Sequence, residues 1–223
     1  MKIYYKSYDG SFIFYKNNSL VKVSRSNPLI ATNDKHAKLI LRDLRKNEAK
    51  TDPFSILGLS MFASSLDKKK VNEIIIILLK NLDFDLLLYR FFEDEELVKL
   101  MNQKYDPFVS SFNEIFDIKL YVIKNLIKNT NSDSDKKLFK KFILKLNKFY
   151  LTIFFKLSGM SKSVILSYFF LKKKVGISNF FELINLENKF QQNRWGYVDE
   201  QKKIDEYYLS TLKKISFFLK NIN

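Results

Sequence analysis

The hydrophobic pattern of this chain changes its period once, near Asn33, and this change constrains the fold more than any other feature. Before that point apolar and polar residues alternate in short runs, which are separated by the pairs Asp9-Gly10 and Asn17-Asn18. Such pairs favour the tight turns of β-hairpins. Beyond that point apolar residues recur three and four positions apart, which is the spacing of an amphipathic helix. The sequence therefore predicts the α+β class, with strands first and helices after them.

The predicted domain organisation follows this change of period. We expect a small N-terminal β-rich domain at residues 1–32 and a larger, mainly α-helical C-terminal domain at residues 33–223. In an alternative division the first domain extends to about residue 67 and includes its flanking helices. A chain of 223 residues is long enough for either arrangement.

Local signals subdivide the helical part. We expect a helix break near Pro107, because proline lacks the backbone donor that a helix interior uses. Residues 138–170 predict one or two long amphipathic helices. Asn179 followed by Glu182 resembles a capping box, and residues 201–222 predict a charged helix that frays.

Charge and cysteine content limit the classes of function. The chain has no cysteine, which excludes disulfides, thiolate metal sites and cysteine nucleophiles. Its net charge of +15 is compatible with a nucleic-acid-binding protein. The basic residues are mostly lysine and are spread along the whole chain, as an AT-rich genome would encode them. We favour this compositional origin and keep a basic nucleic-acid-binding protein as the alternative.

Signatures of an enzyme or a membrane protein are missing from the sequence. No glycine-rich phosphate loop or nucleophile motif occurs, and His36, the only histidine, is expected on the surface. We therefore expect no catalytic residue, no metal and no cofactor, and a protein that is not an enzyme. The remaining enzyme hypothesis uses Asp83, Asp85 or Glu187 as acid–base groups. The longest apolar run, 74–79, is far shorter than the roughly 20 residues of a membrane span, so we expect a soluble intracellular protein.

A segment near the C-terminus carries the most informative side chains. On a helical wheel Glu187, Gln191 and Arg194 lie along one flank of an apolar stripe that begins at Leu183. In one interpretation these residues form a partly buried network that docks the helix. In the other, the stripe is open to a partner protein and Trp195 is its anchor, since tryptophan is favoured at interface hot spots. The spacing does not decide between the two.

Five segments in a fixed order resemble one family of proteins. They are "SNPLIATNDKHAKLI", "TDPFSILGLSMFASSLD", "DLLLYR", "KYDPFVSSFNEIFDIKL" and "KFQQNRWG". Over residues 11–200 they are similar, in order and spacing, to the ATP-twelve type of ATP synthase F(1) assembly chaperone. The chain departs from the family pattern at residues 187–189, where Glu-Asn-Lys replaces a run of acids.

The resemblance implies a non-enzymatic chaperone. It would bind the unassembled alpha subunit of the F(1) sector, prevent its aggregation and release it when it pairs with the beta subunit. From the sequence itself we expect no membrane insertion and no stable nucleic-acid binding, and a monomer when free is the default expectation. The sequence shows no transit-like leader, so the expected location is the bacterial cytoplasm, or the mitochondrial matrix in a eukaryote. The partner-binding residues implied are Glu187, Gln191, Arg194, Trp195, Asp85, Tyr89 and Arg90.

Overall fold

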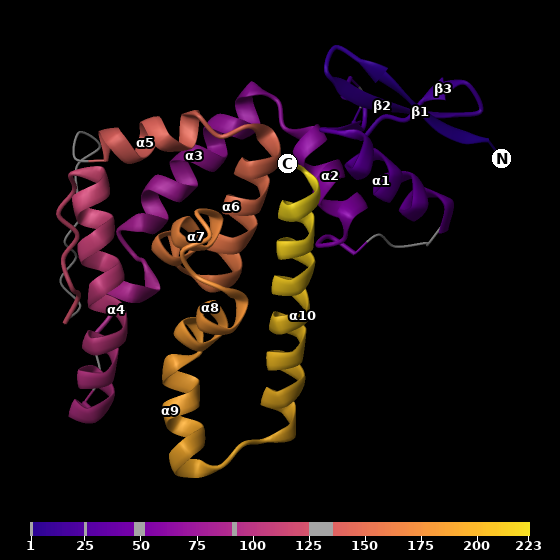
Figure 1. Cartoon of the computed structure of the whole chain (residues 1–223). Helices are drawn as coiled ribbons and strands as arrows, with labels where there is room; N and C mark the ends of the chain where they lie inside the picture. Colours follow the sequence, from indigo (N-terminus) through magenta and orange to yellow (C-terminus); the bar gives the residue numbers. More distant parts are fainter. Residues whose placement is uncertain (1, 25, 47–51, 91–92, 125–135) are drawn as a thin grey trace. The chain divides into compact units, whose positions relative to one another are not determined.

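The structure is a computed structural model that describes residues 2–24, 26–46, 52–90, 93–124 and 136–223 (Figure 1). The chain forms two compact units. Unit 1 consists of Met1–Val71, Asn147–Ile153 and Leu209–Asn223, and unit 2 consists of Asn72–Leu146 and Phe154–Tyr208. The helices α3 (Lys68–Leu82), α6 (Lys148–Ser161) and α10 (Asp199–Asn221) contribute residues to both units.

Unit 1 contains a four-stranded sheet organised around strand β2. Strands β1 (Ile3–Tyr8) and β2 (Ser11–Lys16) form an antiparallel hairpin, and the other edge of β2 pairs with β3 (Ser19–Leu20) and β4 (Ile30–Ala31). The four residues of the two predicted turn pairs all have positive φ, between 45° and 70°. Asparagine, aspartate and glycine tolerate this conformation best, and type I′ turns require it. The predicted hairpin turns are confirmed.

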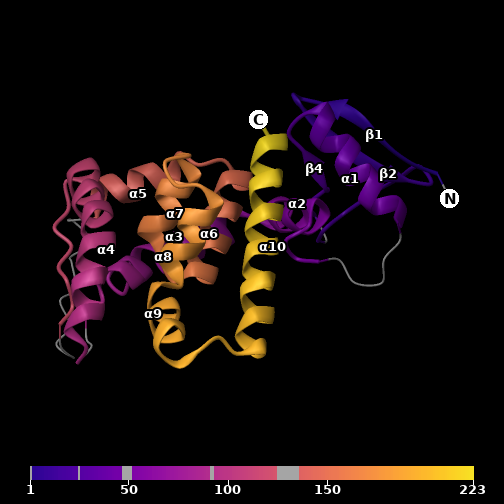
Figure 2. The same ribbon diagram turned by 60° about the horizontal axis from the view of Figure 1, so that its bottom comes forward.

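Two helices of unit 1 complete its fold. Helix α1 (Asp34–Lys46) packs against β1, β2 and β4, and α2 (Ile56–Ser65) packs against α1 and β4 (Figure 2). The Asn33 side chain accepts a hydrogen bond from the His36 backbone N–H at 2.8 Å and so caps α1. The inner face of the hairpin buries Ile3 and Phe14, which explains why alternate residues of these strands are apolar.

His36 is buried, and its predicted surface position is wrong. Its Nδ1 accepts from the Thr32 backbone N–H at 3.2 Å, and its Nε2 lies 2.8 Å from Ser60 Oγ. Because the Ser60 hydroxyl donates to a main-chain carbonyl of α2, Nε2 carries the imidazole proton. The rings of Phe149 and Phe218 meet the imidazole edge to face at 5.4 and 5.3 Å. Burial lowers the pKa of His36 to about 4, so the side chain is neutral near pH 7.

The end of α10 is anchored, although the sequence predicts a fraying tail. Asn33 Nδ2 donates to the Asn221 carbonyl at 2.9 Å, and Thr32 Oγ1 donates to the Ile222 carbonyl at 2.9 Å. The Phe218 side chain is completely buried. The helix has charged residues on one face, and its other face is apolar and packed, which stabilises the end.

In the residues that the structure describes, the named elements of unit 2 are all helices, and one isolated β-bridge pairs Tyr89 with Ile123. After α3 unit 2 contains the 3₁₀ helix η1 (Leu86–Leu88), α4 (Glu95–Phe116), α5 (Lys137–Leu144), α6, α7 (Val164–Leu171), α8 (Ile177–Ile184), α9 (Leu186–Trp195) and the start of α10. Residues 138–170 thus form parts of three helices, and not the one or two that were predicted. The break after α6 occurs at Lys162, whose φ is 54°, and Ser163 then caps α7.

Two local predictions about unit 2 are wrong. Helix α4 continues through Pro107, because Tyr105 and Phe112, which flank the proline, are both buried and hold the two halves in one packed helix. The capping box at Asn179 is not formed. Helix α8 begins at Ile177 with Gly176 at the N-cap position, so Asn179 lies within the first turn.

The core of unit 2 is a cluster of aromatic rings on α4, α5, α6 and α7. Ring centroids within this cluster lie 4.6 to 6.2 Å apart, mostly edge to face, a geometry that stabilises beyond simple burial. Its members are Phe112, Phe116, Phe139, Phe142, Phe154 and Tyr168.

The predicted α+β class with a β-rich N-terminus is confirmed. The domain boundaries at residue 32 or about 67 stay predictions. None of the helices in the described ranges is long and apolar enough to cross a membrane.

Candidate partner-binding site

A cleft of about 280 Å³ opens in unit 2 beside α9, and we call it the α9 cleft. Two of the predicted partner-binding residues, Tyr89 and Glu187, line it. Tyrosine and methionine side chains form the apolar walls, while Glu187 and neighbouring amides supply polar groups. Other residues that line the α9 cleft are Met101, Tyr105, Asn185, Gln201, Ile204 and Tyr208.

Asp85 lies beneath this region and is completely buried. Its Oδ1 accepts from the Leu87 backbone N–H at 3.0 Å and from the Ser163 hydroxyl at 2.7 Å, and its Oδ2 accepts from the Ile165 N–H at 2.9 Å. It therefore caps both η1 and the N-terminus of α7. Burial raises the pKa of Asp85 to about 6, although these hydrogen bonds act in the opposite direction.

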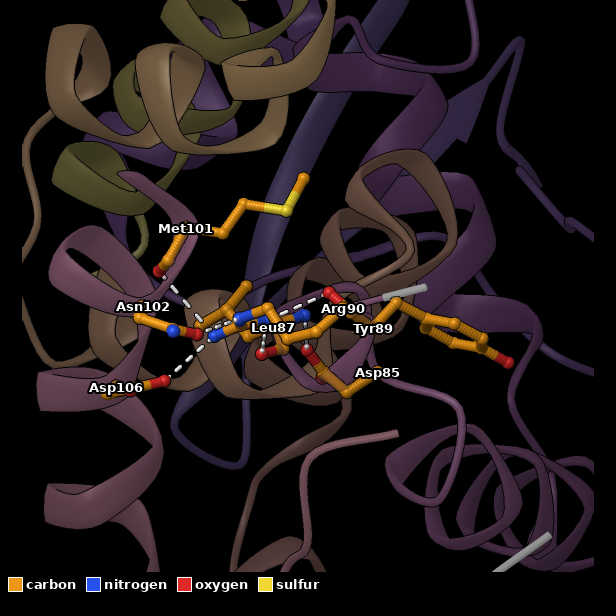
Figure 3. A network of polar contacts seen from close by, with 7 residues as sticks. All are labelled: Asp85, Leu87, Tyr89, Arg90, Met101, Asn102 and Asp106. Carbon is orange, nitrogen blue, oxygen red and sulfur yellow. Dashed lines mark hydrogen bonds and ion pairs between the residues drawn. The ribbon is translucent and has the colours of Figure 1, made fainter. Parts of the chain in front are cut away.

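Arg90 is the second buried charge near the α9 cleft (Figure 3). Its guanidinium donates to the carbonyls of Leu87 and Tyr89 at 2.7 and 2.9 Å. It also donates to Asn102 Oδ1 and to Asp106 Oδ1, both at 2.8 Å, so it fastens η1 to α4. Figure 3 shows these partners converging on the guanidinium from two sides.

Burial decides what these predicted residues can contribute. The side chains of Asp85 and Arg90 lie inside the protein, so they support a surface and do not form part of it. Tyr89, which precedes Arg90 in the sequence, is 37% exposed and lines the α9 cleft. The whole set stays a prediction as a partner-binding site, with Tyr89 as its exposed member in this region.

Tyr105 connects the wall of the α9 cleft to the next helix pair. Its hydroxyl donates to the Leu183 carbonyl at 2.7 Å, and its ring lies 5.1 Å from the Arg90 guanidinium carbon. Burial raises the pKa of this tyrosine. The hydroxyl is therefore a fixed donor that holds the end of α8 against α4.

The helix that carries Glu187, Gln191 and Arg194 starts separately from the helix before it. The helix is interrupted at Asn185, so α8 and α9 are two separate helices. The predicted stripe assumed one continuous helix from Leu183 to Arg194, and that assumption is wrong. Within α9 the predicted spacing still brings Gln191 Nε2 within 3.3 Å of Glu187 Oε1. No residue of α9 is buried, so its polar side chains face solvent or the α9 cleft.

Arg194 docks α9 onto the start of α4. It forms ion pairs with Asp94 and with Glu96, the latter at 2.7 Å, and its guanidinium carbon lies 4.5 Å from the centre of the Phe190 ring. Asp94 also caps α4 by accepting from the Leu97 N–H, and this bond, together with Arg194, lowers its pKa. The first interpretation of this segment, a polar network that docks the helix onto the rest of the protein, therefore applies to Arg194.

Trp195 fits the other interpretation, because it is exposed to solvent. With Tyr197 and Val198 it forms an apolar connection between α9 and α10 that we call the aromatic turn; their exposed fractions are 84%, 51% and 64%. Gly196 has a φ of 90°, a conformation that favours glycine. The Tyr197 hydroxyl donates to Asp205 Oδ2 at 2.9 Å, which attaches the aromatic turn to α10.

The rest of this apolar surface was not predicted from the sequence. Tyr197 and Val198 follow Trp195 directly, and Ile204 and Tyr207 on α10 are also exposed, at 43% and 58%. The available signal was the run of apolar residues within a segment that is otherwise charged, since contiguous exposed apolar residues mark interaction surfaces.

The carboxylates of the enzyme hypothesis are not gathered in one cleft. Asp83 pairs with Lys136 at 2.5 Å in a separate groove between α3 and α5, Asp85 caps two helices, and Glu187 alone lines the α9 cleft. Within the described part of the chain, no group of three or more His, Asp or Glu residues could hold a metal ion.

Comparison with known proteins gives matches only among solved structures. No family model and no curated protein matches this chain. Atp12 from Paracoccus denitrificans is 17% identical with a TM-score of 0.83, and the match covers 100% of this chain and 97% of that one. The chain has the Atp12 fold. A mutant of Atp12p from P. denitrificans matches equally well, at 17% identity and a TM-score of 0.83 over 100% of this chain and 96% of that one.

A third structure shares the Atp12 fold. It is Atu1473 from Agrobacterium tumefaciens, described as a candidate chaperone, at 15% identity and a TM-score of 0.83 over 99% of this chain and 84% of that one. Residues 11–200 were predicted to resemble this type of protein, and the resemblance is confirmed at the level of the fold. At these identities the likeness concerns the fold alone.

Proposed function

We propose that this protein is an assembly chaperone of the ATP synthase F(1) sector, which binds the unassembled alpha subunit until the beta subunit replaces it. The observation that carries the proposal is the aromatic turn beside the α9 cleft, on a chain with the Atp12 fold. Trp195 is the apolar anchor, and Glu187 and Gln191 supply a polar edge. Catalytic residues are not needed for this function.

The physical requirement for such a chaperone is a difference in affinity. It must bind the unassembled subunit better than the assembled one, because a ligand with equal affinity for two states shifts neither. An apolar anchor flanked by a carboxylate meets this requirement if the beta subunit covers the same client surface later. Binding to the unassembled subunit then also protects it from aggregation.

Capture of the alpha subunit tests this proposal. Tagged protein is co-expressed with the alpha subunit and purified, and Trp195→Ala and Glu187→Lys are compared with the wild type. Tyr8→Ala is the matched control, because Tyr8 is an exposed aromatic residue of unit 1, at 67%. We expect reduced capture by the first two variants and unchanged capture by the control. Equal capture of the alpha subunit by the wild type and all three variants would show that Trp195 and Glu187 do not bind it.

The same preparation tests the alternative function that the net charge of +15 suggests, which is nucleic-acid binding. A basic nucleic-acid-binding protein would retain nonspecific nucleic acid with an affinity that falls steeply as salt increases. We expect no such retention at near-physiological salt. The proposed location is the cytoplasm of a bacterium or the mitochondrial matrix, and the proposed free form is a monomer.

A further inference from the structure

We infer that the groove between α4 and α7 is a second docking surface, and that it takes a client segment in which apolar side chains are flanked by acids. The α4–α7 groove has a volume of about 640 Å³ and lies wholly within unit 2. Its lining includes Phe108, Ile115, Tyr168, Phe169, Lys172 and Lys174. None of the four residues predicted on α9 lines it.

The floor of the α4–α7 groove is aromatic and already rigid. The rings of Phe108 and Phe169 meet edge to face at 5.3 Å, and Tyr168 packs on Phe169 at 5.2 Å. Tyr168 and Phe169 are nearly buried, whereas Ile115 on the α4 wall is 46% exposed. A ligand would therefore meet a preformed apolar surface and would not have to order it first.

The rim of the α4–α7 groove is positive, and the described residues that line it include no acid. Lys172 Nζ lies 5.2 Å from the centre of the Phe142 ring and 5.9 Å from that of Tyr168, so its ammonium is held above the aromatic cluster. Lys174 also lines the α4–α7 groove. A carboxylate is the complementary group for two lysines next to an apolar floor.

The turn that carries these lysines has a fixed geometry. The Lys174 N–H donates to the Phe169 carbonyl at 2.9 Å, and the Lys173 N–H donates to the Phe170 carbonyl at 2.9 Å. Lys173 itself has a φ of 58°. These are the two bonds and the left-handed residue of a Schellman motif, where glycine is the usual residue. Lysines near a helix C-terminus also interact favourably with the helix dipole. That interaction alone does not explain why these lysines lie beside an apolar groove.

Charge and shape together select the occupant. An amphipathic segment can place apolar side chains at i, i+3, i+4 and i+7 in such a groove, and acids at its flanks would meet Lys172 and Lys174. The inference rests on the proposed function only in naming the alpha subunit as the source of the segment. A second copy of this chain or a phosphate backbone would be a different occupant.

Peptide binding tests the α4–α7 groove directly. The probe is a fluorescein-labelled amphipathic peptide with leucine at i, i+3, i+4 and i+7 and glutamate at the flanking positions, followed by fluorescence anisotropy. We expect the double variant Lys172→Glu/Lys174→Glu to bind about tenfold more weakly. A peptide with lysine in place of glutamate should bind this variant better than it binds the wild type. The control Lys140→Glu/Lys141→Glu reverses two exposed lysines outside the α4–α7 groove and should bind like the wild type.

Several results would overturn the inference. They are unchanged affinity of the Lys172→Glu/Lys174→Glu variant, equal loss in the control, preference for single-stranded nucleic acid over the peptide, and self-association that occupies the α4–α7 groove. Ile115→Asp is an independent variant at an exposed position, and it should weaken the peptide even if the charge reversal impairs folding. If the peptide binds as expected but the alpha subunit is not captured, the α4–α7 groove stands and the proposed function fails. If the alpha subunit is captured and the peptide does not bind, the proposed function stands and the inference about the α4–α7 groove fails.

Discussion

Replacement of Arg90 should cost this protein a large part of its stability. The side chain is completely buried, and its partner Asp106 is 48% exposed. Arg90→Met removes the donors that satisfy the Leu87 and Tyr89 carbonyls and Asn102. Each buried acceptor left unsatisfied costs about 1–3 kcal/mol.

The expected loss in the free energy of unfolding is about 3 kcal/mol. It falls at the lower end of the range for breaking a buried ion pair, because water can reach Asp106 after the substitution. Arg90→Lys keeps a charge but loses the planar fork, so we expect an intermediate loss of about 1–2 kcal/mol. Asp106→Asn should cost less than about 1 kcal/mol, as for a half-exposed pair.

Urea denaturation followed by far-UV circular dichroism measures these losses. Arg42→Met is the control, because the Arg42 side chain is 58% exposed and pairs only with its neighbour Asp43 among the interactions described; it should change stability by less than about 0.5 kcal/mol. If Arg90→Met is as stable as this control, then Arg90 does not fasten η1 to α4. The role of Arg90 as a buried support for the surface around the α9 cleft would then be wrong.

Three further predictions concern single residues. His36 has a folded pKa of about 4 against an ordinary 6.5, so the unfolded chain binds the proton first, and the contribution of His36 to stability should fall by roughly 3 kcal/mol as pH drops from 6.5 towards 4. Asp85, whose pKa burial raises to about 6, acts in the opposite direction over this range, so the loss is measured as the change with pH in the difference in unfolding free energy between the wild type and His36→Gln. Gly58→Ala should destabilise by about 1–3 kcal/mol, because its Cβ would lie 2.2 Å from the Asp52 carbonyl oxygen, whereas Gly159→Ala, with nothing within 4 Å, should be neutral or stabilising in the same urea titration. Trp195→Ala should leave the melting temperature unchanged, since this side chain is 84% exposed, and a clear decrease would show that it packs internally.

The sequence predicted the elements that depend on local chemistry. The turn pairs Asp9-Gly10 and Asn17-Asn18 adopt the positive φ angles that these residue types tolerate. The change of period near Asn33 marks the boundary between strands and helices. These features need no information from distant parts of the chain.

The features that the sequence did not predict depend on packing. His36 lies in a lysine-rich helix start, but the helix turns its imidazole towards Phe149 and Phe218, which follow more than a hundred residues later. Pro107 stays inside α4 because both halves of that helix are packed, and the break at Asn185 has no glycine or proline to signal it. Tertiary contacts outweigh local preference at all three positions.

The candidate site was predictable in part for the same reason. Spacing of four residues indicated the pair Glu187 and Gln191, and the structure contains it. The ion pairs of Arg194 join it to Asp94 and Glu96 on another helix, which no local pattern indicates. The buried position of Asp85 follows from its hydrogen bonds to α7, 78 and 80 residues away in the sequence.

The most direct test of the proposed function is the fate of the alpha subunit during refolding. Denatured alpha subunit is diluted into buffer with or without an equimolar amount of this protein, and light scattering is recorded before and after the beta subunit is added. We predict that scattering is suppressed, that the two proteins co-elute, and that the beta subunit displaces this protein from the complex. Scattering that is unchanged by the wild type, or a complex that the beta subunit cannot dissociate, would contradict the account.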